Sequence, residues 1–333
     1  VTTGTVNTLI GGLSGDALTV GNSNVAVGYG SLTTDTKGDR NVAIGVSALE
    51  TQNFTTSTDA YNVAVGYTAG QSITTGSQNT MIGGLAGDAT TTADNITAVG
   101  YHSLSSNTTG TQNVAVGSLA LDANTTANNN TAVGHASLGS NTTGDQNTGF
   151  GAFTLDTTTT GASNTAVGYA AMDGNTTGDN NVAVGHLALD ANTTADNNTA
   201  VGKSALGANT TGANNTALGH ISLQSNTTGA QNTAVGRNSF GANTTASNGT
   251  AVGHSALGAN TTGADNTAVG KDALVTNTTG PYNTGIGKSA LAANTTGANN
   301  SALGYNSLGS NTTGAGNTAV GYTASDAITT GSN

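Results

Sequence analysis

The chain has 333 residues, 50 of them Gly, with no Cys, no Trp and one Pro, and its formal net charge is −11 with only six Lys and Arg. Without cysteine there is no disulfide framework, thiolate nucleophile or thiolate metal site, and without a basic face no nucleic-acid partner is expected. No apolar run approaches the ~20 residues of a membrane-spanning helix, so no membrane span is expected in this segment.

A 17-residue repeat runs through the sequence. Its marker is the glycine of each Asn-Thr-Ala-Val-Gly stretch, which falls at Gly11, Gly28 and Gly45, then every 17 residues from Gly66 to Gly321. Numbered from its first Asn, each of the 19 units follows N-[TV]-A-V-G-x-x-[AS]-L-x-x-N-T-T-G-x-x. The single 21-residue spacing, between Gly45 and Gly66, predicts a surface loop of four extra residues within 50–61.

The repeat predicts an all-β fold, a parallel β-solenoid of about 19 coils. Seventeen residues are too few for a helical-hairpin repeat, which needs more than ~30. The Thr-Ala-Val stretch alternates with period two, as a strand does. We therefore expect strands at positions 2–5, a second short strand around position 9, and no helix longer than two turns within Asn113–Asn317.

The apolar positions suggest which side chains fill the solenoid. Position 4 is always apolar and position 9 is usually Leu, so positions 2, 4 and 9 are predicted to face the core and the alanine at position 3 to face outward. Val133, Val167, Val184, Leu138 and Leu189 should then be buried. Four units carry a small residue at position 9 instead of Leu: Gly15, Gly70, Gly87 and Ser325.

Turn chemistry agrees with this interpretation. Glycine at position 5 suits a positive φ or a backbone approach that no Cβ allows. Asparagine at position 1 can form an amide ladder between coils or close an Asx-turn. Residues 1–333 are interpreted as a single continuous repeat array, a segment of a longer fibre whose open strand edges favour association with itself.

The Asn-Val-Ala-Val-Gly and Asn-Val-Ala-Ile-Gly strings, such as Asn24–Gly28, Asn41–Gly45 and Asn113–Gly117, resemble the signature of the YadA-like head domain of trimeric autotransporter adhesins. The resemblance implies a left-handed β-roll, a homotrimer, a bacterial outer surface and binding to extracellular matrix or surface glycan. The family's repeat is shorter, and the Asn-Thr-Thr-Gly loop resembles an insertion into it. Similar repeats also resemble those of phage tail fibres.

Position 6 gathers most of the aromatic and cationic side chains. Four of the six Lys and Arg and four of the five His lie there, which predicts a continuous stripe outside the core. The stripe is a candidate strip for glycan or an acidic surface, or else a seam between subunits. Its candidate binding residues are Tyr101, His135, Tyr169, His186, Lys203, His220, Arg237, His254, Lys271, Lys288, Tyr305 and Tyr322.

The Asn-Thr-Thr loop repeats a glycosylation sequon. We interpret the motif as residues typical of a turn, with a row of N-linked glycans as the alternative. The acceptor residues are Asn107, Asn124, Asn141, Asn175, Asn192, Asn209, Asn226, Asn243, Asn260, Asn277, Asn294 and Asn311. An ice-binding solenoid is a weaker alternative, because the paired threonines are adjacent and adjacent strand residues point to opposite faces.

Catalytic and metal chemistry is not indicated. The acids lie mostly in loop columns such as position 10, no His-x-x-x-His pair occurs, and nothing marks a unique nucleophile, so no catalytic residue, metal or cofactor is expected. The sequence therefore predicts a non-enzymatic extracellular or cell-surface fibre of adhesin type, with a phage tail-fibre shaft as the alternative. Its partners would be copies of itself, as a homotrimer or an end-to-end fibre, and a surface glycan or matrix.

Overall fold

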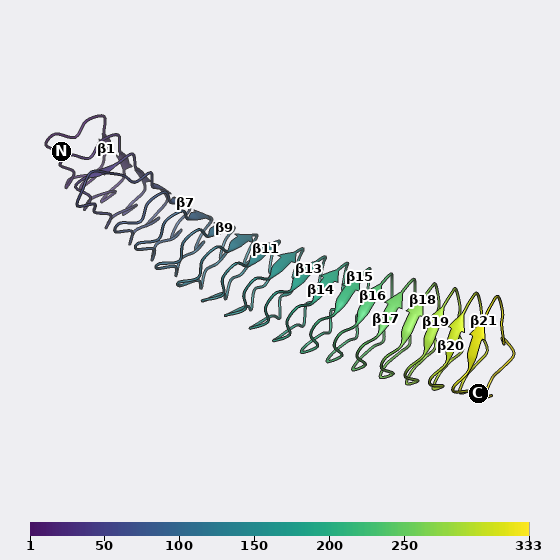
Figure 1. Cartoon of the computed structure of the whole chain (residues 1–333). Helices are drawn as coiled ribbons and strands as arrows, with labels where there is room; N and C mark the ends of the chain where they lie inside the picture. Colours follow the sequence, from purple (N-terminus) through teal and green to yellow (C-terminus); the bar gives the residue numbers. More distant parts are fainter. Residues whose placement is uncertain (333) are drawn as a thin grey trace. The chain divides into compact units, whose positions relative to one another are not determined.

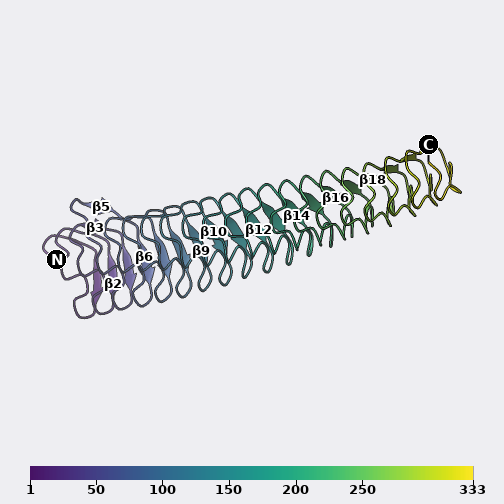
Figure 2. The same ribbon diagram turned by 90° about the horizontal axis from the view of Figure 1, so that it is seen from below.

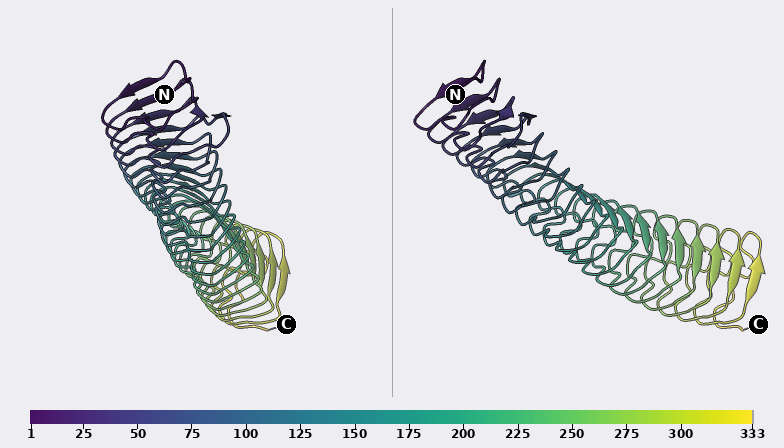
Figure 3. Two further views of the ribbon diagram at one scale, coloured as in Figure 1. Left: turned by 90° about the vertical axis from the view of Figure 1, so that its left-hand side faces the viewer. Right: turned by 60° about the vertical axis from the view of Figure 1, so that its left-hand side comes forward.

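The computed structural model describes residues 1–332, and the chain divides into two compact units, Val1–Asn164 and Thr165–Asn333. Within each unit the backbone winds into coils of about 17 residues, and the strands of successive coils lie side by side along one side (Figures 1 and 3). No helix occurs among the described residues. A parallel β-solenoid with a 17-residue repeat is thereby confirmed, with one strand in most coils.

The first unit contains one long set of three-residue strands and one short pair. The set comprises β1 (Thr8–Ile10), β2 (Val25–Val27), β4 (Val42–Ile44), β6 (Val63–Val65), β7 (Thr80–Ile82), β8 (Thr97–Val99), β9 (Val114–Val116), β10 (Thr131–Val133) and β11 (Thr148–Phe150). The short pair is β3 (Gly38–Asp39) with β5 (Thr58–Asp59).

The second unit continues the same pattern. Its strands are β12 (Thr165–Val167), β13 (Val182–Val184), β14 (Thr199–Val201), β15 (Thr216–Leu218), β16 (Thr233–Val235), β17 (Thr250–Val252), β18 (Thr267–Val269), β19 (Thr284–Ile286), β20 (Ser301–Leu303) and β21 (Thr318–Val320). Neighbours pair in parallel and in register, so that Thr199 lies beside Thr216 and Val201 beside Leu218.

The expected second strand around position 9 is absent from the described coils. Positions 6–11 form turns, because positions 7 and 9 adopt left-handed φ values, 60° at Leu119 and 51° at Leu121. Left-handed residues interrupt an extended segment. The expectation of two strands per coil was therefore wrong, although the position-9 leucines do point into the coil.

The sheet faces the opposite way from the prediction. Position 3 is the inner position: Ala132, Ala166 and Ala183 have no exposed area. Val133, Val167 and Val184 are only half-buried, so their predicted burial was wrong, whereas Leu138 and Leu189 are fully buried as predicted. In coils that carry Leu at position 9 and Asn at positions 1 and 12, these three side chains fill the narrow interior, so a methyl group is enough at position 3.

Two columns of buried asparagines accompany the leucines. At position 1, Asn113 accepts at Oδ1 from the backbone N–H of Asn130 (2.9 Å) and donates from Nδ2 across the coil to the carbonyl of Ala127 (2.7 Å). At position 12, Asn124 donates from Nδ2 to Oδ1 of Asn107 in the preceding coil (2.8 Å). The position-1 asparagines thus link successive coils, mainly through backbone-to-side-chain bonds and not through the amide–amide ladder that was one of the two expectations. An amide–amide ladder lies instead at position 12, where a surface loop was expected.

In coils with Gly in place of Leu at position 9, large side chains at other positions fill the interior. A Cβ on Gly15 would lie 2.7 Å from Leu9, a position-3 residue, and 3.0 Å from Leu18, a position-12 residue. A Cβ on Gly87 would lie 2.8 Å from Met81, also at position 3. Large residues at positions 3 and 12 thus occupy the space of the absent leucine.

The four-residue insertion lies on the side of the first unit away from the sheet, where β3 and β5 pair (Figure 2). Arg40 forms an ion pair with Asp59 and lies over the ring of Tyr61. Beneath it Asp35 replaces the position-12 asparagine and is fully buried, accepting from Nε2 of Gln52 (2.8 Å). The loop was predicted within 50–61, and the structure confirms it.

Candidate functional site

The glycine at position 5 turns the chain out of the strand and sets the direction of position 6. All of these glycines have φ between 124° and 146°. A Cβ on Gly202 would lie 2.5 Å from the carbonyl oxygen of Gly219 in the next coil. Positive φ and this close approach both exclude other residues, and position 6 leaves the turn pointing to solvent.

We call the side chains at position 6 the position-6 row. The structure places all twelve predicted stripe residues on the surface: Tyr101, His135, Tyr169, His186, Lys203, His220, Arg237, His254, Lys271, Lys288, Tyr305 and Tyr322. Because one such side chain occurs per coil, neighbours are separated by about one strand spacing, ~4.8 Å. The row is therefore an unbroken line of aromatic and basic side chains in the second unit, whereas in the first unit small residues such as Ser118 and Ala152 interrupt it.

Side chains of the row contact one another from coil to coil. In the second unit the rings of Tyr169 and His186 stack at 5.7 Å, and those of Tyr305 and Tyr322 at 5.2 Å. The Lys288 ammonium lies 5.5 Å from the centre of the Tyr305 ring. In the first unit His135 instead meets Phe153, a position-7 residue of the next coil, edge to face at 5.2 Å.

Cations concentrate in one stretch of the row. From Lys203 to Lys288 six successive coils carry a basic residue at position 6. Nη1 of Arg237 lies 3.4 Å from Nε2 of His254. Asp272, at position 7, is the acid of this stretch, 3.6 Å from Nζ of Lys271 and 3.9 Å from Nδ1 of His254.

The outward positions 2 and 4 form a second surface, which we call the threonine–valine face. In the second unit position 2 is Thr, Val or Ser, and position 4 is Val, Leu or Ile in every coil. Position 4 is substantially exposed, at 48% for Leu218, 49% for Leu303 and 69% for Val320. A regular column of exposed aliphatic side chains is unusual on the surface of a soluble monomer.

The sequon asparagines lie inside the coil. Every one of them has no exposed area: Asn107, Asn124, Asn141, Asn175, Asn192, Asn209, Asn226, Asn243, Asn260, Asn277, Asn294 and Asn311. The amide nitrogen that a glycan would occupy donates instead to neighbouring carbonyl oxygens, as Asn209 does to Asn192 (3.0 Å) and to Gly212 (2.9 Å). A glycan there does not fit the folded coil, and the loop acts as turn chemistry.

The paired threonines differ in environment. The position-13 hydroxyl donates to the carbonyl of the next coil, as Thr108 does to Thr125 (3.1 Å). The position-14 threonines, such as Thr211, are exposed. A paired array of free hydroxyls, which ice binding would need, is therefore not formed by this loop.

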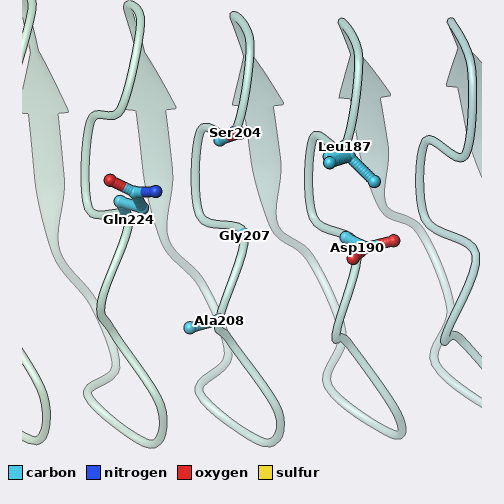
Figure 4. Close-up of a pocket in the computed structure, with 6 residues that line it drawn as sticks. All are labelled: Leu187, Asp190, Ser204, Gly207, Ala208 and Gln224. Carbon is cyan, nitrogen blue, oxygen red and sulfur yellow. The ribbon is translucent and has the colours of Figure 1, made fainter.

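The acids at position 10 border shallow hollows between coils. One hollow of the second unit has a volume of about 220 Å³. Its lining residues, drawn in Figure 4, are Leu187, Asp190, Ser204, Gly207, Ala208 and Gln224. Burial raises the pKa of the Asp190 carboxyl, the charge of Asp173 raises it further, and His186 opposes the shift. Burial also raises the pKa of Asp173. The hollow is open and carries one carboxylate, which suits neither a metal cage nor a paired acid–base site.

One serine, one histidine and two acids approach each other in the first unit. Ser105 donates its hydroxyl hydrogen to Oδ1 of Asp122, and Nδ1 of His102 lies 3.8 Å from the same oxygen. Burial raises the pKa of nearby Asp88. The hydroxyl is held by a carboxylate and not by the imidazole, so the three groups do not form a Ser–His–Asp triad.

Among residues 1–332 no group of three or more His, Cys, Asp or Glu is placed to hold a metal ion. The same residues contain no helix long and apolar enough to cross a bilayer. Comparison with known protein families and with characterised proteins gives no match to this chain.

Proposed function

We propose that the chain is a structural, non-enzymatic fibre of an extracellular or cell surface, of the adhesin type that its repeat resembles, and that it assembles as a homotrimer through the threonine–valine face. The observation that carries the proposal is the unbroken column of aliphatic side chains on the outer side of β12–β21.

The argument for self-association is the cost of leaving this face in water. Val201 and Leu218 neighbour each other on adjacent strands, and Leu218 remains 48% exposed. Burying such side chains contributes roughly 25 cal/mol per Å² of apolar area removed from water. A second copy presents the same regular column, so coils of two chains match along the whole face without any specific partner residue.

The threonines of the same face are compatible with a buried contact. In the second unit position 2 is Thr in eight coils, with Val182 and Ser301 in the other two. A threonine methyl packs like that of a valine, while its hydroxyl can reach a nearby carbonyl. No charged side chain occurs at positions 2 or 4 of the second unit. Depletion of charge is typical of the core of a protein interface.

The oligomeric state tests the proposal. Light scattering coupled to size exclusion should give three copies for the wild-type chain and one copy for Val201→Lys/Leu218→Lys, because two buried ammonium groups oppose assembly. The matched control is Thr194→Lys/Thr211→Lys, which adds the same charge to the same region at exposed position 14. A monomeric wild type, or equal dissociation of the control, would contradict the proposed assembly.

A further inference from the structure

The basic stretch of the position-6 row is exceptional for this chain. Of its six Lys and Arg, four lie in the row within the second unit, at Lys203, Arg237, Lys271 and Lys288. Two histidines, His220 and His254, fill the remaining places. A chain of net charge −11 has therefore placed most of its fixed positive charge in one line.

The charge in this line is largely uncompensated. Asp272 neighbours only Lys271 and His254. Neither Lys203, Arg237 nor Lys288 forms an ion pair with a carboxylate of residues 1–332. Like charges held about one or two strand spacings apart, roughly 5–10 Å, repel each other. Folding alone gives no reason for this arrangement, because Ser118, Ala152 and other small residues occupy the same position elsewhere.

Aromatic rings flank the cations on both sides in the same row. Tyr169 and His186 stack before the stretch, and Tyr305 and Tyr322 stack after it. Lys288 joins the two kinds of side chain, because its ammonium lies 5.5 Å from the Tyr305 ring. Exposed ring faces offer apolar contact together with a polar tip.

We propose that the position-6 row between Tyr169 and Tyr322 binds a linear acidic polysaccharide, with the polymer lying along the stack of coils. The cations meet carboxylate or sulfate groups through charge-assisted hydrogen bonds, and the rings meet the apolar faces of the sugars. This inference gives a ligand class to the surface-binding role proposed above and rests on that role, but it does not require the trimer.

The shape of the row favours this ligand over other polyanions. The row is one side chain wide and about nine strand spacings long, roughly 43 Å, which fits a single extended polymer. Lys203, Arg237 and Lys271 recur in every second coil, about 10 Å apart, close to the length of two sugars, so the cations can meet the acidic group of every second sugar in a polymer of acidic sugars. A bilayer surface or a nucleic-acid duplex needs a broad basic face, and the rest of the chain is acidic.

Two equally charged double variants test the proposal on the full chain. Arg237→Gln/Lys271→Gln removes two cations from the row, and Lys37→Gln/Arg40→Gln removes the two that lie outside it. Binding to immobilised polygalacturonate at low ionic strength should weaken more than about tenfold in the first variant, from two charge-assisted contacts, and should hardly change in the second. Fully methyl-esterified polygalacturonate has the same backbone but no charge, and it should bind neither the wild-type chain nor either variant.

The outcomes are separable. Equal loss in both double variants would assign binding to net charge and overturn the proposal, as would equal binding of the esterified polymer. Single-stranded poly(dT) or phosphatidylserine vesicles binding as tightly as polygalacturonate would overturn the choice of ligand. Light scattering on each variant separates polysaccharide binding from trimer assembly. Lost binding with unchanged assembly supports the proposal. Lost assembly in Arg237→Gln/Lys271→Gln would instead mean that the row is a contact between subunits and would overturn the proposal. A monomeric wild type that binds would leave the row proposal intact.

Discussion

Two corners of each coil are built on different principles. At the glycine corner, position 5, all 19 units carry glycine and every one has a positive φ. At the asparagine turn, positions 12–15, position 12 is Asn in 12 units but Leu, Asp, Gln, Ile or Thr in others. Position 15 is Gly or Ala in every unit except the one that carries the insertion.

The difference shows what limits the sequence at each corner. The glycine corner is fixed by the backbone, because no side chain relieves a positive φ near 130° and a neighbouring carbonyl at the same time. The asparagine turn is fixed by side-chain hydrogen bonds, which other residues replace when the surrounding core changes with them. Leu18 and Ile73 occupy position 12 in coils that have Gly15 and Gly70 at position 9.

The largest effect is expected at the glycine corner. Gly202→Ala places a Cβ 2.5 Å from the Gly219 carbonyl oxygen at φ 132° and should cost about 2–3 kcal/mol of unfolding free energy. Amide hydrogen exchange should show the loss in that coil and its immediate neighbours, because coils contact only adjacent coils. Uniform loss of protection across residues 1–332 would contradict this.

An intermediate effect is expected from the asparagine ladder. Asn209→Ala leaves Oδ1 of Asn192 and the carbonyl of Gly212 without their partner. Nδ2 of Asn226 loses one of its two acceptors and keeps the carbonyl of Gly229. Each buried unpaired group costs about 1–3 kcal/mol, so a loss near 2 kcal/mol by denaturant titration is expected after local relaxation. Exposed Thr211→Ala in the same turn is the control and should change stability little.

A small effect is expected when the same change as at Gly202 is made at the asparagine turn. Gly212→Ala should lower the unfolding free energy by less than Gly202→Ala does. Its Cβ would lie 2.2 Å from the carbonyl oxygen of Gly229, so the turn must shift, but Gly212 has no left-handed φ to preserve. Ala127, Ala195 and Ala246 already occupy this position with their ladders intact. A loss equal to that of Gly202→Ala would remove the distinction between the corners.

The smallest effect lies between the corners, at position 10. Burial raises the folded-state pKa of Asp190 above its ordinary value of 3.8, so the ionised carboxyl destabilises the fold and stability falls as pH rises through the folded-state pKa. Asp190→Asn should therefore be slightly more stable than wild type at pH 7, and the difference should vanish below pH 3.8 in thermal unfolding. If the stability of Asp190→Asn relative to wild type increased as the pH is lowered, the predicted direction of the pH dependence would be wrong.

The sequence predicted the period, the glycine corner, the buried position-9 leucines and the insertion, because each follows from spacing or from one residue's backbone geometry. It did not predict which side of the strand faces inward. The alternation places positions 2 and 4 on one side of the strand and position 3 on the other, but it does not say which side faces the core. The hydrophobicity of valine at position 4 suggested the side of positions 2 and 4, and this was wrong. Two units carried a signal for the correct side: each has a large residue at position 3 (Leu9, Met81) together with Gly at position 9 (Gly15, Gly87). This exchange of size indicates that position 3 faces the interior beside position 9.

The candidate site was predictable only in part. The exposure of the position-6 row follows from its place after a turn, but its stacking partners depend on how far each side chain leans toward the neighbouring coil. The burial of Asn124 and its equivalents was missed because Asn-Thr-Thr-Gly is typical of a surface turn. A buried amide is stable here because each one finds partners in its own and the adjacent coil.

The β-strands of each unit pair only with strands one repeat away, so the number of repeats in the gene sets the length of the solenoid. Duplication of one 17-residue repeat in the gene would add one coil, about 4.8 Å of sheet, and replace one strand pair with two equivalent pairs. Deletion would shorten the unit by the same step. A lineage carrying this gene can therefore tune the reach of the protein, and the number of cations in its row, through unequal recombination between near-identical repeats.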